Sequence, residues 1–186
     1  MLIVMIPLMD NVISDTFSRP NQVGLGSTET GQLWLIYGDE GWGINGNAAI
    51  YDNPSSTEHS FAVVNTRSPN GTVSADITFA TGASVGLAIR FGDFKNNFFA
   101  RMASSGLGLF RHQGGFSTSI GNYAFTPVNG QTYNLRITAQ ASTFYVYLDN
   151  VLRITSNDTF GPILAGAGLR AFTAGATKWD KFLVGV

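Results

Sequence analysis

The sequence predicts an all-β protein, a two-sheet antiparallel β-sandwich with an extended N-terminal arm. The 186 residues include 22 Gly and 14 Phe, and only 12% are charged, which is typical of a turn-rich β protein. Short runs of alternating apolar and polar residues are separated by Gly, Asn, Pro and Ser, at the spacing expected of a sandwich. No segment has the pattern of a long amphipathic helix.

Alternation and turn residues place the expected strands in order along the chain. We predict strands at 15–19, 33–37, 47–51, 61–66, 72–80, 84–92, 97–103, 107–112, 115–120, 132–140, 143–148, 151–156, 167–172 and 177–185. Stretches such as "YDNPSSTEHS", "FGDFKNN" and "TPVNG" supply the connecting turns. No repeat or linker divides residues 15–186, so they are expected to form one sandwich. Trp34, Trp42 and Trp179 stand in apolar segments and are expected in its core.

Residues 1–14, with the apolar opening "MLIVMIPLMDNV", are expected to lie outside the sandwich. Pro7 breaks this run, which is shorter than the roughly 20 residues needed to span a bilayer. The run also lacks the positive start and the cleavage site of a secretory signal. Two interpretations remain open: a first strand under the core, or an arm that pairs with a neighbouring subunit. The arm's apolar side chains are Leu2, Ile3, Val4, Ile6 and Leu8.

The hairpin formed by 143–148 and 151–156 turns at Asp149-Asn150, and the length of its loop decides which side chains are buried. A two-residue loop pairs Leu148 with Val151 and brings Arg153 onto the face of Phe144. An odd loop with a bulge instead pairs Tyr147 with Val151. We predict the odd loop. It places Phe144, Val146, Leu152 and Ile154 in the core, and Tyr145, Tyr147, Val151 and Arg153 on the opposite face.

The same alternation in the middle strands separates core positions from a second face. If these strands share a sheet with the hairpin, this noncore face collects aromatic and basic side chains. Its members are Arg90, Phe99, Arg101, Phe110, His112, Arg136, Tyr145 and Tyr147.

Several motifs together resemble a known superfamily. They are "LGSTETGQLWLI", "GWGINGNAAIYD", "VGLAIRFGDFKNNFFARM", "YNLRITAQASTFYVYLDNVLRI" and "ATKWDKFLVGV". In this order they resemble the concanavalin A-like, laminin-G-like jelly-roll superfamily, in the version that recurs in bacteriophage tail and other virion proteins. The resemblance covers roughly Asp15 to Val186. It implies a jelly roll with a concave face that is often used to bind carbohydrate and is sometimes purely structural.

The noncore face has the chemistry that a sugar requires. Aromatic rings cover the apolar side of a pyranose, and polar groups take its hydroxyls. Clustered arginines would favour an anionic ligand. The candidate glycan-binding residues are Arg90, Arg101, Phe110, His112, Arg136, Tyr145 and Tyr147. The alternative is that these arginines brace strands and that a loop covers the tyrosines.

Enzymatic chemistry finds little support in the sequence. A glycosidase needs a pair of carboxylates, but no two acidic residues stand two positions apart, and the adjacent Asp39 and Glu40 lie in a turn. The pattern Gly-x-Ser-x-Gly at 82–86 ("GASVG") leads into the expected strand 84–92 and not into a helix, so it is not a nucleophile elbow, and there is no Cys. A net charge of −1 argues against a nucleic-acid partner. We therefore expect neither an enzyme nor a cofactor.

Laminin-G-like domains often carry a calcium ion, and the resemblance implies a peripheral site for one. Asp15, Asp158 and Asp180 are the candidate ligands. The alternative is that these carboxylates satisfy turns.

The resemblance implies a non-enzymatic bacteriophage virion structural protein, a tail, fibre or head-decoration domain on the particle exterior. The expected partners are other virion proteins or further copies of this chain through the arm, and host surface carbohydrate through the concave sheet. The alternative is a carbohydrate-binding module of a secreted bacterial protein. That alternative would predict an export signal or a flanking catalytic domain, and the sequence shows neither.

Overall fold

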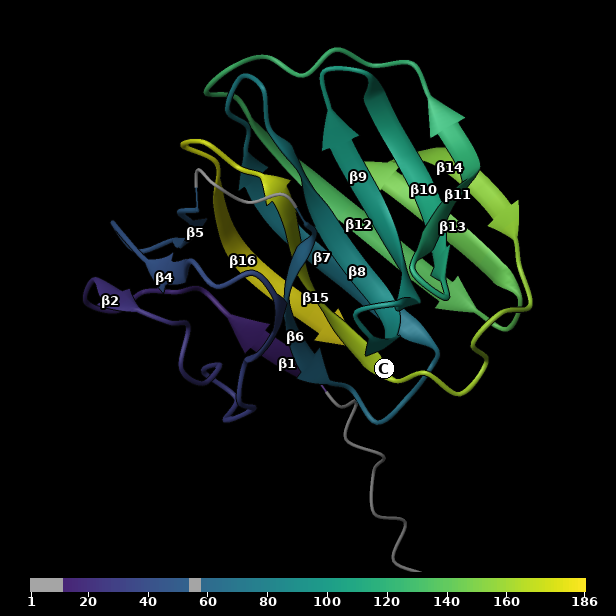
Figure 1. The fold of residues 1–186 in the computed structure, drawn as a ribbon, viewed down its shortest axis with the longest axis horizontal. Coiled ribbons are helices and arrows are strands. Elements are labelled where there is room, and N and C mark those ends of the chain that lie inside the picture. The colour runs from purple at the N-terminus through teal and green to yellow at the C-terminus, as the bar shows by residue number, and fades with distance from the viewer. Residues whose placement is uncertain (1–11, 54–57) are drawn as a thin grey trace, which may run out of the picture.

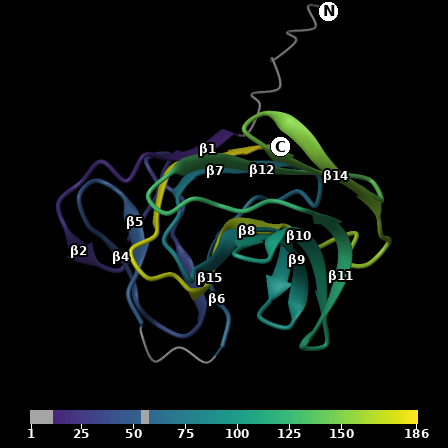
Figure 2. The ribbon, with the colours of Figure 1, turned by 90° about the horizontal axis from the view of Figure 1, so that it is seen from above.

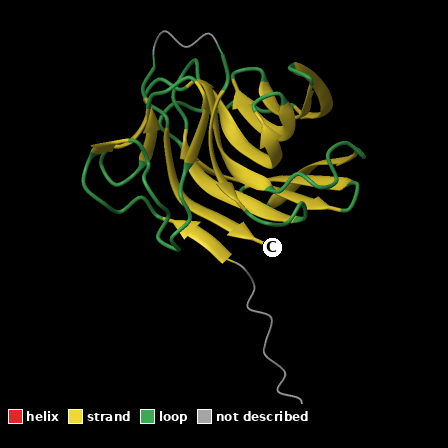
Figure 3. Ribbon diagram, turned by 60° about the horizontal axis from the view of Figure 1, so that its bottom comes forward, coloured by secondary structure: helices red, strands yellow, loops and turns green. Residues whose placement is uncertain are grey.

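Two antiparallel sheets pack face to face in the computed structural model, which describes residues 12–53 and 58–186 (Figure 1). Within these ranges the chain forms strands and loops without a helix (Figure 3). The described part therefore has no helix that could cross a membrane. The prediction of an all-β two-sheet sandwich is confirmed.

The nine-stranded sheet, called the back sheet below, has the order β14-β13-β12-β7-β16-β5-β4-β2, and β1 also pairs with β16. Its strands are β1 (Val12–Asp15), β2 (Gln22–Val23), β4 (Trp42–Ile44), β5 (Ala49–Tyr51), β7 (Gly71–Thr78), β12 (Thr132–Gln140), β13 (Thr143–Leu148), β14 (Val151–Asn157) and β16 (Lys178–Gly185).

The seven-stranded sheet, called the front sheet, has the order β11-β10-β9-β8-β15-β6-β3. Its strands are β3 (Leu35–Gly38), β6 (Ser60–Asn65), β8 (Ser84–Asp93), β9 (Asn96–Ala103), β10 (Gly106–Gln113), β11 (Phe116–Tyr123) and β15 (Gly166–Thr173). Figure 2 shows the front sheet arching away from the back sheet, with β6 and β11 on either side of β8.

The core between the sheets is formed by alternate residues of both. Leu135 and Ile137 of β12 and Leu87 of β8 are fully buried there, as the period of two in a strand requires. The three tryptophans also lie in this core, as predicted. Trp42 and Trp179 pack with their ring centroids 5.1 Å apart.

The first strand differs from the prediction. β1 begins at Val12 and ends at Asp15, so the expected strand 15–19 is wrong and the expected domain boundary after residue 14 falls inside β1. The chain leaves the extended conformation at Phe17, whose φ is 54°. The buried carboxylate of Asp15 then accepts hydrogen bonds from Arg19 at 2.7 and 2.9 Å and from Trp34 Nε1 at 2.9 Å. These bonds hold the turn after β1 against the core.

The β13–β14 hairpin corrects the predicted loop. Leu148 pairs with Val151 across a two-residue turn, in which Asp149 and Asn150 have φ values of 50° and 63°, as a type I′ turn requires. The bulge lies instead inside β14, where Tyr147 pairs with Leu152 and Val146 with Ile154. The core positions of Phe144, Val146 and Ile154 are confirmed, but Leu152 is 46% exposed.

Two glycines set the spacing of the central front strands. A Cβ on Gly86 would lie 1.8 Å from the carbonyl oxygen of Ala100, and a Cβ on Gly168 would lie 1.9 Å from that of Ala62. Both distances are far below van der Waals contact. β8 and β15 therefore approach their neighbours more closely than a side chain at either position permits.

We expect Gly86→Ala to lower the free energy of unfolding by about 1 to 3 kcal/mol, because the added methyl forces β8 away from β9. Urea denaturation measures the difference. The matched control is Gly185→Ala in β16, where a Cβ meets no atom within 4 Å, and its effect should stay within about 0.5 kcal/mol. Equal losses in the two variants would contradict this account.

Candidate functional site

The outer face of the front sheet, turned away from the back sheet, carries a second hydrophobic cluster. Phe61, Val63, Ala88, Phe91 and Phe99 are buried in it, and Tyr37, Phe94 and Phe110 pack against it. This cluster is separate from the core between the sheets. The front sheet therefore has buried aromatic side chains on its outer face as well as in the core.

Two arginines lie side by side on this face, separated by a glycine. Gly86 of β8 pairs with Arg101 of β9 on one side and with Arg170 of β15 on the other. Gly86 places no side chain between the two arginines.

Each arginine lies over an aromatic ring. The Cζ of Arg101 is 4.7 Å from the centroid of Phe110, and the Cζ of Arg170 is 4.8 Å from that of Phe99. The two rings themselves stack at 5.1 Å. Cation–π contacts of this kind hold a guanidinium in place and strengthen when water is excluded.

His59, just before β6, packs over the same face. Its ring lies 5.5 Å from Phe172 and 5.6 Å from His112, measured between centroids. Its Nδ1 is 3.2 Å from Nη2 of Arg170; because a guanidinium only donates, Nδ1 is the acceptor. Burial, reinforced by the charge of Arg170, lowers the pKa of His59 from 6.5 to about 3. His59 is therefore neutral at physiological pH.

His112 is the second titratable ring on this face. Its Nδ1 lies 2.8 Å from Oγ of Ser117. Burial and the charge of Arg170 lower the pKa of His112, although Asp93 acts in the opposite direction.

These residues surround a pocket of about 390 Å³, called the arginine pocket below. Its main lining side chains are Ser84, Arg101, Phe110, Arg170, Phe172 and Thr173. Two arginines, several aromatic rings and several hydroxyl groups thus meet in one depression. No acidic residue stands among the described residues that line it.

The predicted glycan-binding residues do not form one face. Arg101 lines the arginine pocket together with Phe110, and His112 lies beside it against His59. The other predicted residues, Arg90, Arg136, Tyr145 and Tyr147, lie elsewhere. The expectation that all these strands share a sheet is wrong, because β12, β13 and β14 belong to the back sheet.

Arg136 and Tyr147 pair across β12 and β13 on the outer face of the back sheet, and Tyr145 lies along the same face. The Cζ of Arg136 is 4.1 Å from the ring centroid of Tyr147. This pair resembles the contact between Arg101 and Phe110, but it lies on the opposite side of the sandwich.

Arg90 braces the sandwich from inside. It stands in a bulge of β8 with a φ of 46°, and its side chain is buried over the ring of Phe144. Its Nε donates to the carbonyl of Pro69 at 2.9 Å, and Nη2 donates to Oδ1 of Asn70 at 3.0 Å. Both contacts hold the turn that precedes β7.

Three residues of the site were not predicted from the sequence. Arg170 lies between the apolar Leu169 and Ala171 in the expected strand 167–172. This alternation indicates that Arg170 faces away from the core. Phe172 is the unpaired residue of a bulge between Ala171 and Thr173, and His59 lies outside any strand. No signal in the sequence placed these two rings over the front sheet.

The calcium candidates are engaged by protein donors. Asp15 binds Arg19, Asp158 pairs with Arg111 at 3.0 Å, and Asp180 accepts a bond from the backbone of Lys181. Among the described residues these carboxylates do not join a group able to hold a metal ion. A calcium ion stays a prediction.

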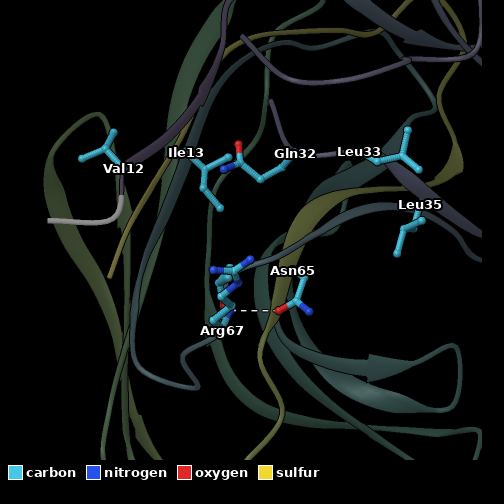
Figure 4. Close-up of a pocket in the computed structure, with 8 residues that line it drawn as sticks. Val12, Ile13, Gln32, Leu33, Leu35, Asn65 and Arg67 are labelled. Carbon is cyan, nitrogen blue, oxygen red and sulfur yellow. Dashed lines mark hydrogen bonds between the residues drawn. The ribbon is translucent and has the colours of Figure 1, made fainter. Parts of the chain in front are cut away.

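A second pocket of about 310 Å³ lies where β1 enters the fold (Figure 4). It is lined mainly by Val12, Ile13, Gln32, Leu33, Leu35 and Arg67. It combines aliphatic side chains with one arginine and lacks the aromatic rings of the arginine pocket, so we place the candidate site on the front sheet. The predicted assembly residues Leu2, Ile3, Val4, Ile6 and Leu8 lie outside the described residues.

Neither a protein-family model nor a curated protein sequence matches the chain. Solved structures do match. Carbohydrate binding module CBM66 from Bacillus subtilis aligns over 96% of each chain at 20% identity with a TM-score of 0.56. The carbohydrate recognition domain of Emp47p aligns over 94% of each chain at 9% identity, with a TM-score of 0.62.

An enzyme is among the similar structures as well. SCLam, a non-specific endo-β-1,3(4)-glucanase from family GH16, aligns over 93% of this chain and 89% of its own, at 9% identity and a TM-score of 0.60. At such identities the likeness shows the fold alone, which is a concanavalin A-like jelly roll.

We expect the melting temperature to fall as the pH is lowered from about 7 to about 5. The pKa values of His59 and His112 are lower in the folded chain than in the unfolded chain. Between these pH values the two histidines therefore bind protons in the unfolded chain but stay neutral in the folded chain. The two histidines therefore contribute to the free energy of unfolding above their unfolded-state pKa of about 6.5, and this contribution is lost as the pH falls below it.

The chain has only two histidines, so the test is direct. His59→Gln should shrink the fall in melting temperature between the two pH values, and adding His112→Gln should nearly remove it. Calorimetry at both pH values gives the comparison. A fall of unchanged size in the double variant would rule out this origin.

Proposed function

We propose that the protein is a non-catalytic carbohydrate-binding module that holds a glycan in the arginine pocket. The observation that carries the proposal is the meeting of Phe110 and Phe172 with guanidinium and hydroxyl groups in one depression of the front sheet. Aromatic side chains present a flat apolar surface to a sugar ring, and a few polar groups orient its hydroxyls. A pocket of about 390 Å³ is large enough for a sugar residue.

The similar structures support this proposal without deciding it. Two of them are named as a carbohydrate binding module and a carbohydrate recognition domain. The glucanase shows that the same fold also serves hydrolysis, so the choice depends on the residues in the pocket.

Those residues favour binding over hydrolysis. Glycoside hydrolysis generally needs two carboxyl groups that flank the scissile bond. The described lining of the arginine pocket supplies arginines, aromatic rings and hydroxyl groups in their place. We therefore expect no release of reducing ends when the protein is incubated with a polysaccharide that it binds.

Between the two functions expected from the sequence, the secreted bacterial module agrees better with the similar structures. The virion role stays a prediction. The genes that flank this one provide the test, because neighbours that encode particle proteins would favour the virion role.

We expect Phe110→Ala to weaken glycan binding about tenfold, because the sugar loses its aromatic contact surface. A glycan array identifies a ligand for the wild-type protein, and isothermal titration calorimetry then measures the affinity of each variant. The matched control is Tyr147→Ala, which removes an aromatic ring that also stacks with an arginine, but on the back sheet.

The control variant should bind as the wild type does. If Tyr147→Ala weakens binding and Phe110→Ala leaves it intact, the site lies on the back sheet. If the wild-type protein binds no glycan on the array, the proposed function fails.

A further inference from the structure

Arg170 brings a buried positive charge to the arginine pocket, and no described carboxylate balances it. Its side chain is 2% exposed. The ion pairs between described residues join Arg19 to Asp15, Arg111 to Asp158 and Lys181 to Asp76. A buried cation is normally paired, because an unpaired one loses its hydration without compensation.

The partners that Arg170 does have are neutral. Its Nη1 donates to the carbonyl oxygen of Ser84 at 2.9 Å and to Oγ of Ser84 at 3.1 Å, and Nη2 donates to His59. Its Nε is buried without a hydrogen-bond partner. These contacts hold the guanidinium in place but leave its charge uncompensated.

Arg101 adds a second positive charge across Gly86. Its Nη2 donates to Oγ of Ser105 at 3.2 Å, and its Nε is also buried without a partner. Burial and then the repulsion from Arg101 lower the pKa of Arg170 to about 9. Both arginines are still charged at neutral pH, so the pocket has a strongly positive potential.

The other titratable groups nearby place no carboxylate in the described lining of the pocket. His59 is neutral, and His112 also has a lowered pKa. Asp93 acts on His112, but its carboxylate accepts hydrogen bonds from the backbone of Lys95 and the side chain of Asn96. It does not line the pocket.

We propose that the arginine pocket binds the anionic group of an acidic sugar, a carboxylate or a sulfate, between Arg101 and Arg170. This inference rests on the proposed function and names the class of glycan. An oxyanion accepts charge-assisted hydrogen bonds from guanidinium groups and neutralises the repulsion between the two arginines. Phe110 then packs against the ring of the same sugar.

The test compares glycans that differ in charge. The probes are polygalacturonate and its fully methyl-esterified form, which carry carboxylates and neutral esters on the same backbone, and dextran sulfate with unmodified dextran. Isothermal titration calorimetry measures the binding of each. We expect at least one acidic glycan to bind about tenfold more tightly than its neutral counterpart, and to weaken as NaCl rises from about 50 mM to about 500 mM.

The variants separate the pocket from a general electrostatic effect. Arg101→Gln should weaken the binding of the acidic glycan about tenfold and leave the neutral one unchanged. Arg136→Gln is the matched control, because it also removes a guanidinium that lies over an aromatic ring, on the opposite face of the sandwich. Its affinity should equal that of the wild type. We choose Arg101 because it is only half-buried, whereas replacing the buried Arg170 would disturb the fold.

Each outcome counts for or against the inference. Equal affinity for acidic and neutral glycans, or equal losses in Arg101→Gln and Arg136→Gln, would overturn the acidic ligand while leaving the carbohydrate-binding module intact. Failure of all four probes to bind would overturn the acidic ligand as well, and the glycan array would then decide the proposed function separately. The carboxylate and sulfate probes distinguish the two anions.

Discussion

The buried guanidinium of Arg170 is the constraint around which the outer face of the front sheet is arranged. A cation removed from water needs compensating contacts on every side. Phe99 supplies its π face below, Ser84 accepts two hydrogen bonds, and the neutral His59 accepts another. The depressed pKa of His59 follows from the same arrangement, because a protonated imidazole would have to share a dry site with Arg170.

Three arginines that lie over aromatic rings have different roles because of the surfaces on which they lie. Arg90 faces inward over Phe144 and holds turns together. Arg136 lies over Tyr147 on the outer back sheet, and Arg101 lies over Phe110 in the arginine pocket. The contact geometry alone is therefore a poor guide to function. Arg101 differs from Arg90 and Arg136 because it lines a pocket and shares that pocket with a second arginine, Arg170.

The sequence was sufficient for most of the longer strands, because these depend on local alternation and turn residues, but not for the strand 15–19 or for the core position of Leu152. The strands 132–140 and 143–148 agree with β12 and β13. The assignment of strands to sheets depends on long-range pairing, which alternation does not encode, and this is why Arg136, Tyr145 and Tyr147 were grouped with Arg101. The bulge in β14 was not predicted either. One extra residue between β13 and β14 is needed to place Val146 opposite a core residue, and this residue can lie in the loop or within the strand.

Gly86 and Gly168 have a consequence for how this surface can diverge in evolution. A side chain at either position would collide with the backbone of a neighbouring strand, so a substitution there forces the central front strands apart. Residues on the rim, such as Ser117, Phe172 and Thr173, take no part in the core between the sheets. Substitutions on the rim are therefore expected to change which ligand is bound without moving the central strands.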